Sequence, residues 1–264
     1  MNTRKLTSGA AAALVLIATA GCAAEETTTT ESGANVIAAG KLTVCTSLPY
    51  KPFEFEQGNE IVGFDMDLAQ KVAEANDLDL DVVVTGFEGI QSGQALNTGK
   101  CDMAVAGMTI TDERSQVIDF SDPYFDATQA LLTKDESLDS LEALDGKTLG
   151  VMTGTTGELY AKENAPKGVT IKAFEDLGLQ STAVKTGQID AAIQDNGPLL
   201  DYAKANPGTY VTAEFDTGEQ YGMAVKKDGN DELLSSINDV LEESRSDGSY
   251  DEIYKTWFGT APTN

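Results

Sequence analysis

The sequence contains no histidine among its 264 residues. A Ser-His-Asp hydrolase site, a histidine-based metal site and a histidine pH switch are therefore all excluded. Basic residues are also few: 18 lysines and arginines stand against 43 aspartates and glutamates, and the formal net charge is −25. Such a chain repels phosphate backbones and has no basic run to overcome the repulsion, so nucleic acid is excluded as a partner. We predict neither a metal nor a cofactor.

A hydrophobic run long enough to cross a membrane as a helix is missing as well. The apolar run at residues 10–18 is short; it follows Arg4 and Lys5 and ends in the small residues Thr19-Ala20-Gly21. This pattern predicts a secretory signal peptide over residues 1–21. Because Cys22 follows directly, the segment resembles a lipoprotein cleavage site, which predicts a lipidated Cys22 on an exported protein anchored to the outer face of the cytoplasmic membrane. The alternative is ordinary signal cleavage beside an incidental cysteine.

The stretch after Cys22 is rich in glutamate and threonine and offers little apolar surface. Such a composition does not bury enough apolar area to fold. We therefore predict that residues 22–38 form a lipidated, flexible tether and that the folded part begins at residue 39.

Strands and helices alternate along most of the remaining chain. In the first unit we expect strands at 42–46, 80–85 and 103–106, a helix from residue 64 and a helix at 87–99. In the second unit we expect strands at 130–133, 148–152 and 189–193, and helices at 137–144, from 155, at 177–187 and at 198–205. A strand at 220–225 and two helices, around 233–241 and from 249, complete the chain. Such alternation is typical of α/β folds whose helices cover both faces of a parallel sheet.

Hydroxyl groups and one guanidinium follow the strand predicted at 103–106. Gly107 ends that strand, and the chain continues through Thr109 and Thr111 into a short helical start that carries Arg114. Open α/β sheets bind ligands just beyond such strand ends, and the planar fork of arginine suits a carboxylate. Taken alone, the pattern also fits an exposed helical arginine with threonine caps.

The wider context resolves this ambiguity through a resemblance. The sequence G-M-T-I-T-D-E-R at 107–114, followed by D-F-S-D-P-Y at 119–124, resembles the signature of the amino-acid-binding proteins of ABC importers, in lipoprotein form. Further matching motifs, in order, are P-F-E-F at 52–55, G-F-D-M-D-L-A at 63–69, G-T-T at 154–156, D-A-A-I-Q-D at 190–195, Y-G-M-A at 221–224 and W-F-G at 257–259. The resemblance extends from residue 40 to 259.

This family implies an α/β fold of the periplasmic binding protein type II class, with two doubly wound lobes joined by a two-strand hinge. Residues 39–127 and 221–264 would form lobe 1, and residues 128–220 lobe 2. The implied function is capture of a free amino acid by hinge closure and its delivery to a membrane permease with ATPase subunits. We expect a monomer and no enzymatic activity.

The resemblance also implies which residues hold the ligand. Arg114 is the candidate for the ligand carboxylate, helped by Thr109 and by the N–H groups at Thr155 and Thr156. Asp195 is the candidate for the ligand ammonium, helped by the carbonyl of Gly107; the alternative is that Asp195 only caps the helix near Pro198. The other expected ligand-binding residues are Ser47, Tyr50, Phe87, Met108, Met152 and Gln194.

The ligand's side chain is expected to be polar and uncharged. Tyr50 and Phe87 would sandwich its aliphatic part, unless they are ordinary core aromatics. Ser47 is neutral where relatives often carry aspartate, and Met152 and Gln194 stand where relatives carry polar or charged groups. No charged partner for the side chain is evident, which favours glutamine or cystine, unless Glu54, Glu56 or Lys134 points inward.

Two other functions stay open. One is an exported enzyme on the same fold, similar to the dehydratases that act on cyclohexadienyl substrates, which would need an acid or base with a shifted pKa. The other is a ligand-sensing subunit that acts through a partner.

Cys45 and Cys101 are expected to be two buried thiols. A disulfide is permitted in an exported protein. However, if Thr46 and Gly107 both reach the ligand-binding edge, Cys101 lies several residues further from that edge than Cys45. At about 3.3 Å per residue this offset exceeds the reach of a disulfide.

Overall fold

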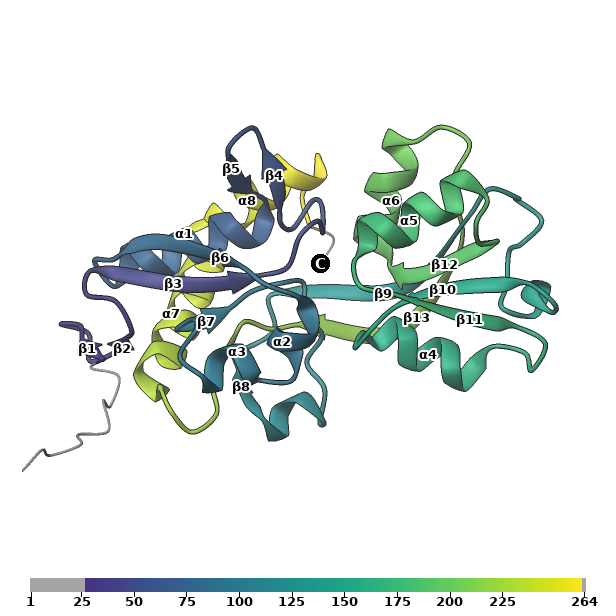
Figure 1. Ribbon diagram of the computed structural model, residues 1–264. Coiled ribbons are helices and arrows are strands. Elements are labelled where there is room, and N and C mark those ends of the chain that lie inside the picture. The colour runs from purple at the N-terminus through teal and green to yellow at the C-terminus, as the bar shows by residue number, and fades with distance from the viewer. Residues whose placement is uncertain (1–26, 263–264) are drawn as a thin grey trace, which may run out of the picture.

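The computed structural model describes residues 27–262 and shows two α/β lobes side by side (Figure 1). The predicted fold class is thereby confirmed. The predicted signal peptide and Cys22 lie outside the described residues. No helix in the described part of the chain is long and apolar enough to cross a membrane.

Lobe 1 is built on a five-stranded sheet with the strand order β6-β3-β7-β14-β8. Strands β3, β6 and β7 are parallel, and β14 is antiparallel to its neighbours β7 and β8. The side chains of β3 alternate between two apolar layers: Leu42 and Val44 face one cluster, and Cys45 faces the other. The strands are β3 (Lys41–Thr46), β6 (Asp79–Val84), β7 (Met103–Ala104), β8 (Ile118–Phe120) and β14 (Ala224–Lys226).

Helices cover both faces of this sheet. Leu68 of α1 and Ile237 of α7 belong to the layer of Leu42, whereas Ile90 of α2 and Leu96 of α3 belong to the layer of Cys45. The bounds are α1 (Phe64–Ala75), α2 (Phe87–Gln91), α3 (Gln94–Asn97), α7 (Asp231–Asp247), α8 (Ser249–Phe258), and the hairpin β4 (Phe55–Gln57) and β5 (Glu60–Val62).

Lobe 2 repeats the plan with the strand order β11-β10-β12-β9-β13. Strands β10, β11 and β12 are parallel, whereas β9 is antiparallel to both β12 and β13. Figure 1 shows α5 and α6 on one side of the sheet and α4 on the other. The elements are β9 (Phe125–Thr133), β10 (Thr148–Met152), β11 (Thr170–Phe174), β12 (Ala191–Asp195), β13 (Tyr210–Tyr221), α4 (Thr156–Asn164), α5 (Leu177–Thr186), α6 (Asn196–Ala205) and the 3-10 turn η2 (Glu142–Leu144).

Both sheets are mixed rather than purely parallel, because the chain passes between the lobes. Strand β9 runs from lobe 1 into lobe 2, and β13 returns beside it in the antiparallel direction (Figure 1). Their pairing extends from Phe125–Tyr221 to Thr133–Tyr210. The register shifts between Phe215 and Glu219, where β13 bulges. The exact lobe boundaries at residues 127/128 and 220/221 stay a prediction.

The N-terminal segment differs from the predicted flexible tether. Thr28–Thr29 (β1) and Asn35–Val36 (β2) form an antiparallel hairpin beside lobe 1. Val36 is buried in the apolar cluster of that lobe, and the backbone of Asn35 exchanges hydrogen bonds with the side chain of Asn230. Residues 28–36 are therefore folded, because buried side chains and a paired backbone hold them.

Several predicted elements are shorter than expected. The helix predicted at 87–99 is divided into α2 and α3 by Gly93, whose φ of 74° lies in the left-handed region. The short helix expected at Arg114 is the 3-10 turn η1 (Arg114–Gln116), and the helix expected at 137–144 is reduced to η2. The strand expected at 220–225 is interrupted at Gly222 and Met223.

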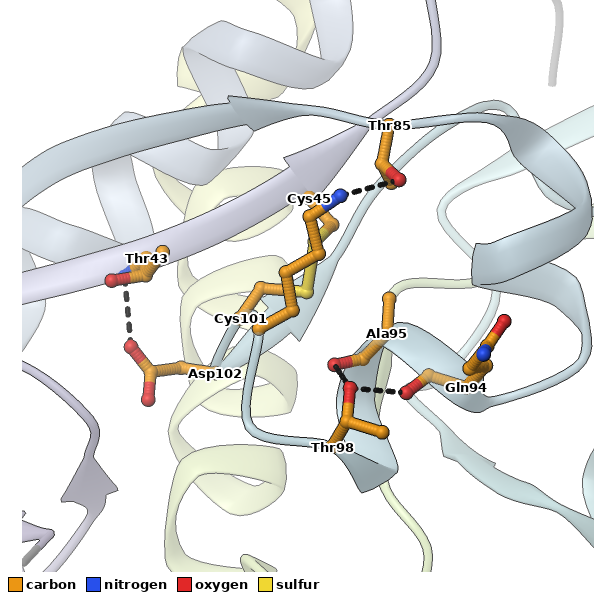
Figure 2. The surroundings of a disulfide bond; sticks show 9 residues. Thr43, Cys45, Thr85, Gln94, Ala95, Thr98, Cys101 and Asp102 are labelled. Atoms are coloured by element: carbon orange, nitrogen blue, oxygen red, sulfur yellow. Dashed lines mark hydrogen bonds between the residues drawn. A yellow bond between two sulfur atoms is a disulfide. The ribbon is translucent and has the colours of Figure 1, made fainter. Parts of the chain in front are cut away.

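Cys45 and Cys101 form a disulfide, so the prediction of two thiols is wrong. Their Cα atoms lie 5.7 Å apart, within the usual range for a disulfide. The predicted offset assumed an extended chain before β7, but the chain bends at Asp102, whose carboxylate accepts the N–H groups of Ile37 and Thr43. Figure 2 shows Cys101 brought back against Cys45 at this bend.

Candidate functional site

A cavity with about 380 Å³ of empty space lies between the lobes. We call it the interlobe cavity. Eleven of the twelve predicted ligand-binding residues line it: Ser47, Tyr50, Phe87, Gly107, Thr109 and Arg114 from lobe 1, and Met152, Thr155, Thr156, Gln194 and Asp195 from lobe 2. Leu48, Pro49, Glu54, Ala106, Asp176 and Leu177 complete the lining.

Met108 is the exception. Its side chain is fully buried in the apolar cluster that also holds Ile90 and Ile118. Its carbonyl accepts the N–H group of Gly222. Met108 therefore packs the interior of lobe 1, and its predicted place in the site is not supported.

Arg114 reaches the cavity from the turn after β7. Its Nη1 donates to the carbonyl of Thr109 at 2.7 Å, and its Nη2 donates across the lobes to the carbonyl of Gly154 at 2.9 Å. The guanidinium carbon lies 5.2 Å from the centre of the Phe87 ring. Burial lowers the pKa of Arg114, and the negative charges of Asp195 and Glu219 act against that effect. Of its five N–H groups three remain, which is enough for a bidentate carboxylate contact.

The start of α4 supplies free N–H groups to the same end of the cavity. The Thr155 hydroxyl accepts the N–H group of Glu158 and donates to the carbonyl of Met152. The Glu158 carboxylate accepts the N–H group of Gly154. The predicted helix cap is therefore present, and its hydrogen bonds use the Thr155 hydroxyl, whose proton is not free for a ligand. The first backbone N–H groups of the helix, from Thr156 on, have no carbonyl partner within the helix and favour an anion.

Asp195 ends β12 and points into the cavity from lobe 2. Tyr50 and Tyr221 donate to its Oδ2, and Gln129 donates to its Oδ1. It occupies the N-cap position of α6, but its side chain makes no capping bond. Burial raises the pKa of Asp195 to about 6, and the nearby Glu219 carboxylate adds to the rise. The capping alternative is therefore not realised, and one position on Oδ1 is left to accept a cation.

Tyr50 and Phe87 are both buried and both line the cavity. The ring of Tyr50 packs on Gly107, whose φ of 51° is left-handed; a Cβ there would lie 2.7 Å from the ring. Glycine is thus required at 107 for two reasons, backbone conformation and space.

Glu54 lines the cavity. The sequence pointed to it only as a charged side chain that would change the expected ligand if it faced inward. Neither of its carboxylate oxygens has a hydrogen-bond donor among the described residues, and the same holds for Oδ1 of the neighbouring Asp65. Burial raises the pKa of Glu54 well above its ordinary value and that of Asp65 to about 6. Burial therefore favours the protonated, neutral form of Glu54. Asp65 Oδ2 accepts the N–H group of Gly107 at 2.8 Å and so orients the peptide that follows Ala106.

Glu219 was missed by the sequence analysis. Its Oε2 accepts hydrogen bonds from the hydroxyls of Thr109 at 3.0 Å and Thr156 at 2.9 Å. Its two carboxylate oxygens also accept from Gln129 Nε2 at 3.2 and 3.0 Å. No local pattern marked this residue, because the β13 bulge determines where its side chain points.

The remaining lining residues determine which side chain fits. Ser47, Met152 and Gln194 line the cavity as expected, and the side-chain Oε1 of Gln194 accepts the N–H group of Asp195. Asp176, the N-cap of α5, adds a carboxylate that was not anticipated. Glu56 and Lys134 are exposed and do not line the cavity.

A family model describing bacterial extracellular solute-binding proteins, family 3, matches residues 42–260. The chain belongs to this family. It is 40% identical over 208 residues to a glutamine-binding protein of an ABC transporter from Bacillus subtilis, covering 77% of this chain and 75% of that protein. It is 34% identical over 219 residues to a probable histidine-binding protein from Campylobacter jejuni, covering 82% and 84%.

Solved structures of the same kind are similar as well. An ancestral arginine-binding protein bound to arginine is 44% identical, with a TM-score of 0.78, covering 83% of this chain and 98% of that one. The structure of an ancestral arginine-binding protein bound to glutamine gives a TM-score of 0.79 at 44% identity, covering 84% and 99%. The resemblance inferred from the motifs is confirmed.

Proposed function

We propose that this solute-binding protein captures a free amino acid in the interlobe cavity and delivers it to the permease of an ABC importer. One observation carries the proposal: Arg114 and Asp195, opposite in charge and from opposite lobes, line the same cavity. An amino acid carries a carboxylate and an ammonium close together, and burying either charge unpaired costs several kcal/mol. The cavity is lined by apolar and aromatic side chains together with these few charged and polar groups, as is usual for small-molecule sites.

In this arrangement each end of the ligand is held by groups from both lobes. Arg114 would grip the carboxylate with its free N–H groups, helped by the N–H of Thr156. Asp195 and the carbonyl of Gly107 would accept the ammonium. Because neither lobe satisfies both charges, the binding energy is realised only when the lobes close.

For the ligand's side chain, we propose a polar, uncharged group such as that of glutamine or cystine. Ser47 and Gln194 offer neutral hydrogen-bonding groups, and burial favours the neutral form of Glu54. A cationic amino acid is the second candidate, because the Asp176 carboxylate lines the cavity without a lysine or arginine partner among the described residues. Asp176→Asn should weaken binding of arginine but leave glutamine binding largely unchanged.

The remaining parts of the proposal concern setting and partners. The protein would be exported after cleavage of residues 1–21, held to the membrane by a lipid on Cys22, and active as a monomer with a permease and its ATPase subunits. It would bind its ligand without turnover.

A thermal-shift screen against free amino acids tests the proposal. A bound amino acid at a hundred times its Kd should stabilise the protein by about 2.7 kcal/mol. Arg114→Ala should abolish this shift, because the ligand carboxylate then has no cation. Lys185→Ala, which removes an exposed charge that contacts only Asn206, is the matched control and should preserve it. A shift that survives in the Arg114 variant would remove this residue from the site.

A further inference from the structure

Glu219 stands on the hinge, at the larger of the two register shifts between β13 and β9. The register jumps from the pair Phe215–Gln129 to the pair Glu219–Ala127, so three residues of β13 bulge opposite Thr128. Gly218 has a left-handed φ of 62°, which suits this turn of the backbone. Beyond the bulge, the Glu219 side chain contacts Thr109 and Thr156, two residues that line the interlobe cavity.

The Glu219 carboxylate is bound by donors from three parts of the molecule. Thr109 belongs to lobe 1, Thr156 opens α4 of lobe 2, and Gln129 lies on the other hinge strand. A hydrogen bond requires the two heavy atoms to lie within about 3.2 Å. One oxygen therefore reaches both threonines only while the lobes are closed.

These contacts also determine which groups remain for a ligand. A hydroxyl has a single proton, and Thr109 and Thr156 both direct theirs at Glu219. The hydroxyls thus join the lobes to the hinge, and the backbone N–H groups are left for the ligand carboxylate. Gln129 in turn donates to Asp195, so Glu219 also helps to hold the ammonium acceptor.

We propose that Glu219 is a positioning residue that couples lobe closure to ligand capture: its carboxylate bridges Thr109 and Thr156 in the closed arrangement and fixes Asp195 through Gln129. This inference rests on the proposed capture of an amino acid by closure. Without the bridge the closed form is less populated, so a bound amino acid escapes faster.

The test compares Glu219→Gln with Glu214→Gln. Glu214 lies on the same strand, is exposed, and contacts Asn196 of lobe 2 only, so its replacement removes the same charge without touching both lobes. Kd and koff are measured with L-glutamine and L-arginine by calorimetry and stopped flow. Glu219→Gln should raise koff and Kd about tenfold or more, as expected for a lost charge-assisted hydrogen bond. Glu214→Gln should match the wild type.

A double-mutant cycle separates bridging from a simple charge effect. Thr156→Val removes one arm of the bridge, and it also serves if Glu219→Gln does not fold. The koff of the double variant should be at most about three times that of the single variant with the higher koff, because both changes break the same contact. Multiplicative effects of the two changes would overturn the proposal, and so would an unchanged or lower Kd in Glu219→Gln.

Small-angle scattering without any amino acid gives a reading that does not depend on the proposed ligand. Glu219→Gln should have a larger radius of gyration than the wild type and Glu214→Gln, and equal radii would overturn the bridge. If the wild type binds no amino acid while the radii differ as expected, the proposed function fails and the bridge stands.

Discussion

The two lobes share a strand order but are attached to the hinge in different ways. At the lobe 1 end, Phe125 of β9 and Tyr221 of β13 are enclosed by aromatic rings, among them Phe53 and Phe258 at 4.8 to 5.4 Å between centroids. At the lobe 2 end, the core beside β9 is aliphatic, with Leu131, Leu132 and Ile193. The bulge of β13 lies between these two regions.

This difference indicates where the hinge bends. Densely packed aromatic rings resist displacement, so the strands move with lobe 1. The bulge at 216–218 interrupts the regular pairing and is the weaker point. We therefore expect lobe 2 to swing about the bulge, next to Glu219, while lobe 1 acts as the fixed base.

The largest effect is expected from the ring at the centre of the aromatic cluster. Phe53→Ala should destabilise the protein by about 3–5 kcal/mol, because a fully buried ring leaves a cavity. It should also raise the Kd for the bound amino acid, because it loosens the hinge strands. Leu149→Ala in the core of lobe 2 is the control, which should lower the free energy of unfolding by about 2–5 kcal/mol and leave Kd nearly unchanged. Denaturant unfolding and calorimetry provide the measurements, and equal changes in Kd would contradict a hinge fixed to lobe 1.

The disulfide is the second difference between the lobes. Among the described residues, the Cys45–Cys101 bond cross-links lobe 1 only. The bond closes a loop with a sequence separation of 56. In the chain-entropy account, replacing Cys45 and Cys101 by alanine should destabilise the protein by about 4 kcal/mol. Urea unfolding of the oxidised protein and of this double variant measures the difference. A difference near zero, or two free thiols by mass spectrometry without reductant, would show that lobe 1 has no such staple in solution.

A third contrast concerns buried acids. Lobe 1 keeps Glu54 and Asp65 near one another, no ion pair with either is found within residues 27–262, and burial raises the pKa of both. A raised pKa means that the folded state keeps a proton that the unfolded chain has released. Stability is therefore full at acidic pH and falls as pH rises above the ordinary value of 4.5 for glutamate, by up to about 1.4 kcal/mol per pH unit.

Glu54→Gln should weaken this dependence on pH, because it removes one of the two buried carboxyl groups with a raised pKa and leaves Asp65. The variant should gain stability relative to the wild type as pH rises from 4.5 towards 7, by up to about 1.4 kcal/mol per pH unit. Melting curves across this range test the prediction. Glu56→Gln, which changes an exposed carboxylate on the neighbouring β4, is the control. Parallel curves for Glu54→Gln and the wild type would mean that folding does not raise the pKa of Glu54.

Most of the fold could be predicted because its strands and helices are marked by local patterns. The strands near Val44 and Val151 are short apolar runs, and the start of α4 carries a capping sequence. Strand β11 was missed because its residues are half-buried or exposed at the edge of a sheet, where no apolar run is needed. The disulfide was missed because it depends on a bend at Asp102, which spacing along an extended chain does not reveal.

The site shows the same division. Residues carried by motifs, such as Arg114, Thr155 and Asp195, line the cavity as predicted. Glu219 has no motif, because its role depends on a bulge that sets the register of two distant strands. From the sequence, Asp176 is recognisable only as the N-cap of a helix. It reaches the cavity because the two lobes lie close together.

The hairpin of β1 and β2 has a consequence for the proposed lipid anchor. Because the chain is folded onto lobe 1 from Thr28, only five residues separate it from Cys22. At no more than about 3.6 Å per residue, this link extends roughly 20 Å at most. An acylated molecule would stay in a thin layer above the bilayer, attached through lobe 1, and its effective concentration at the permease would be high.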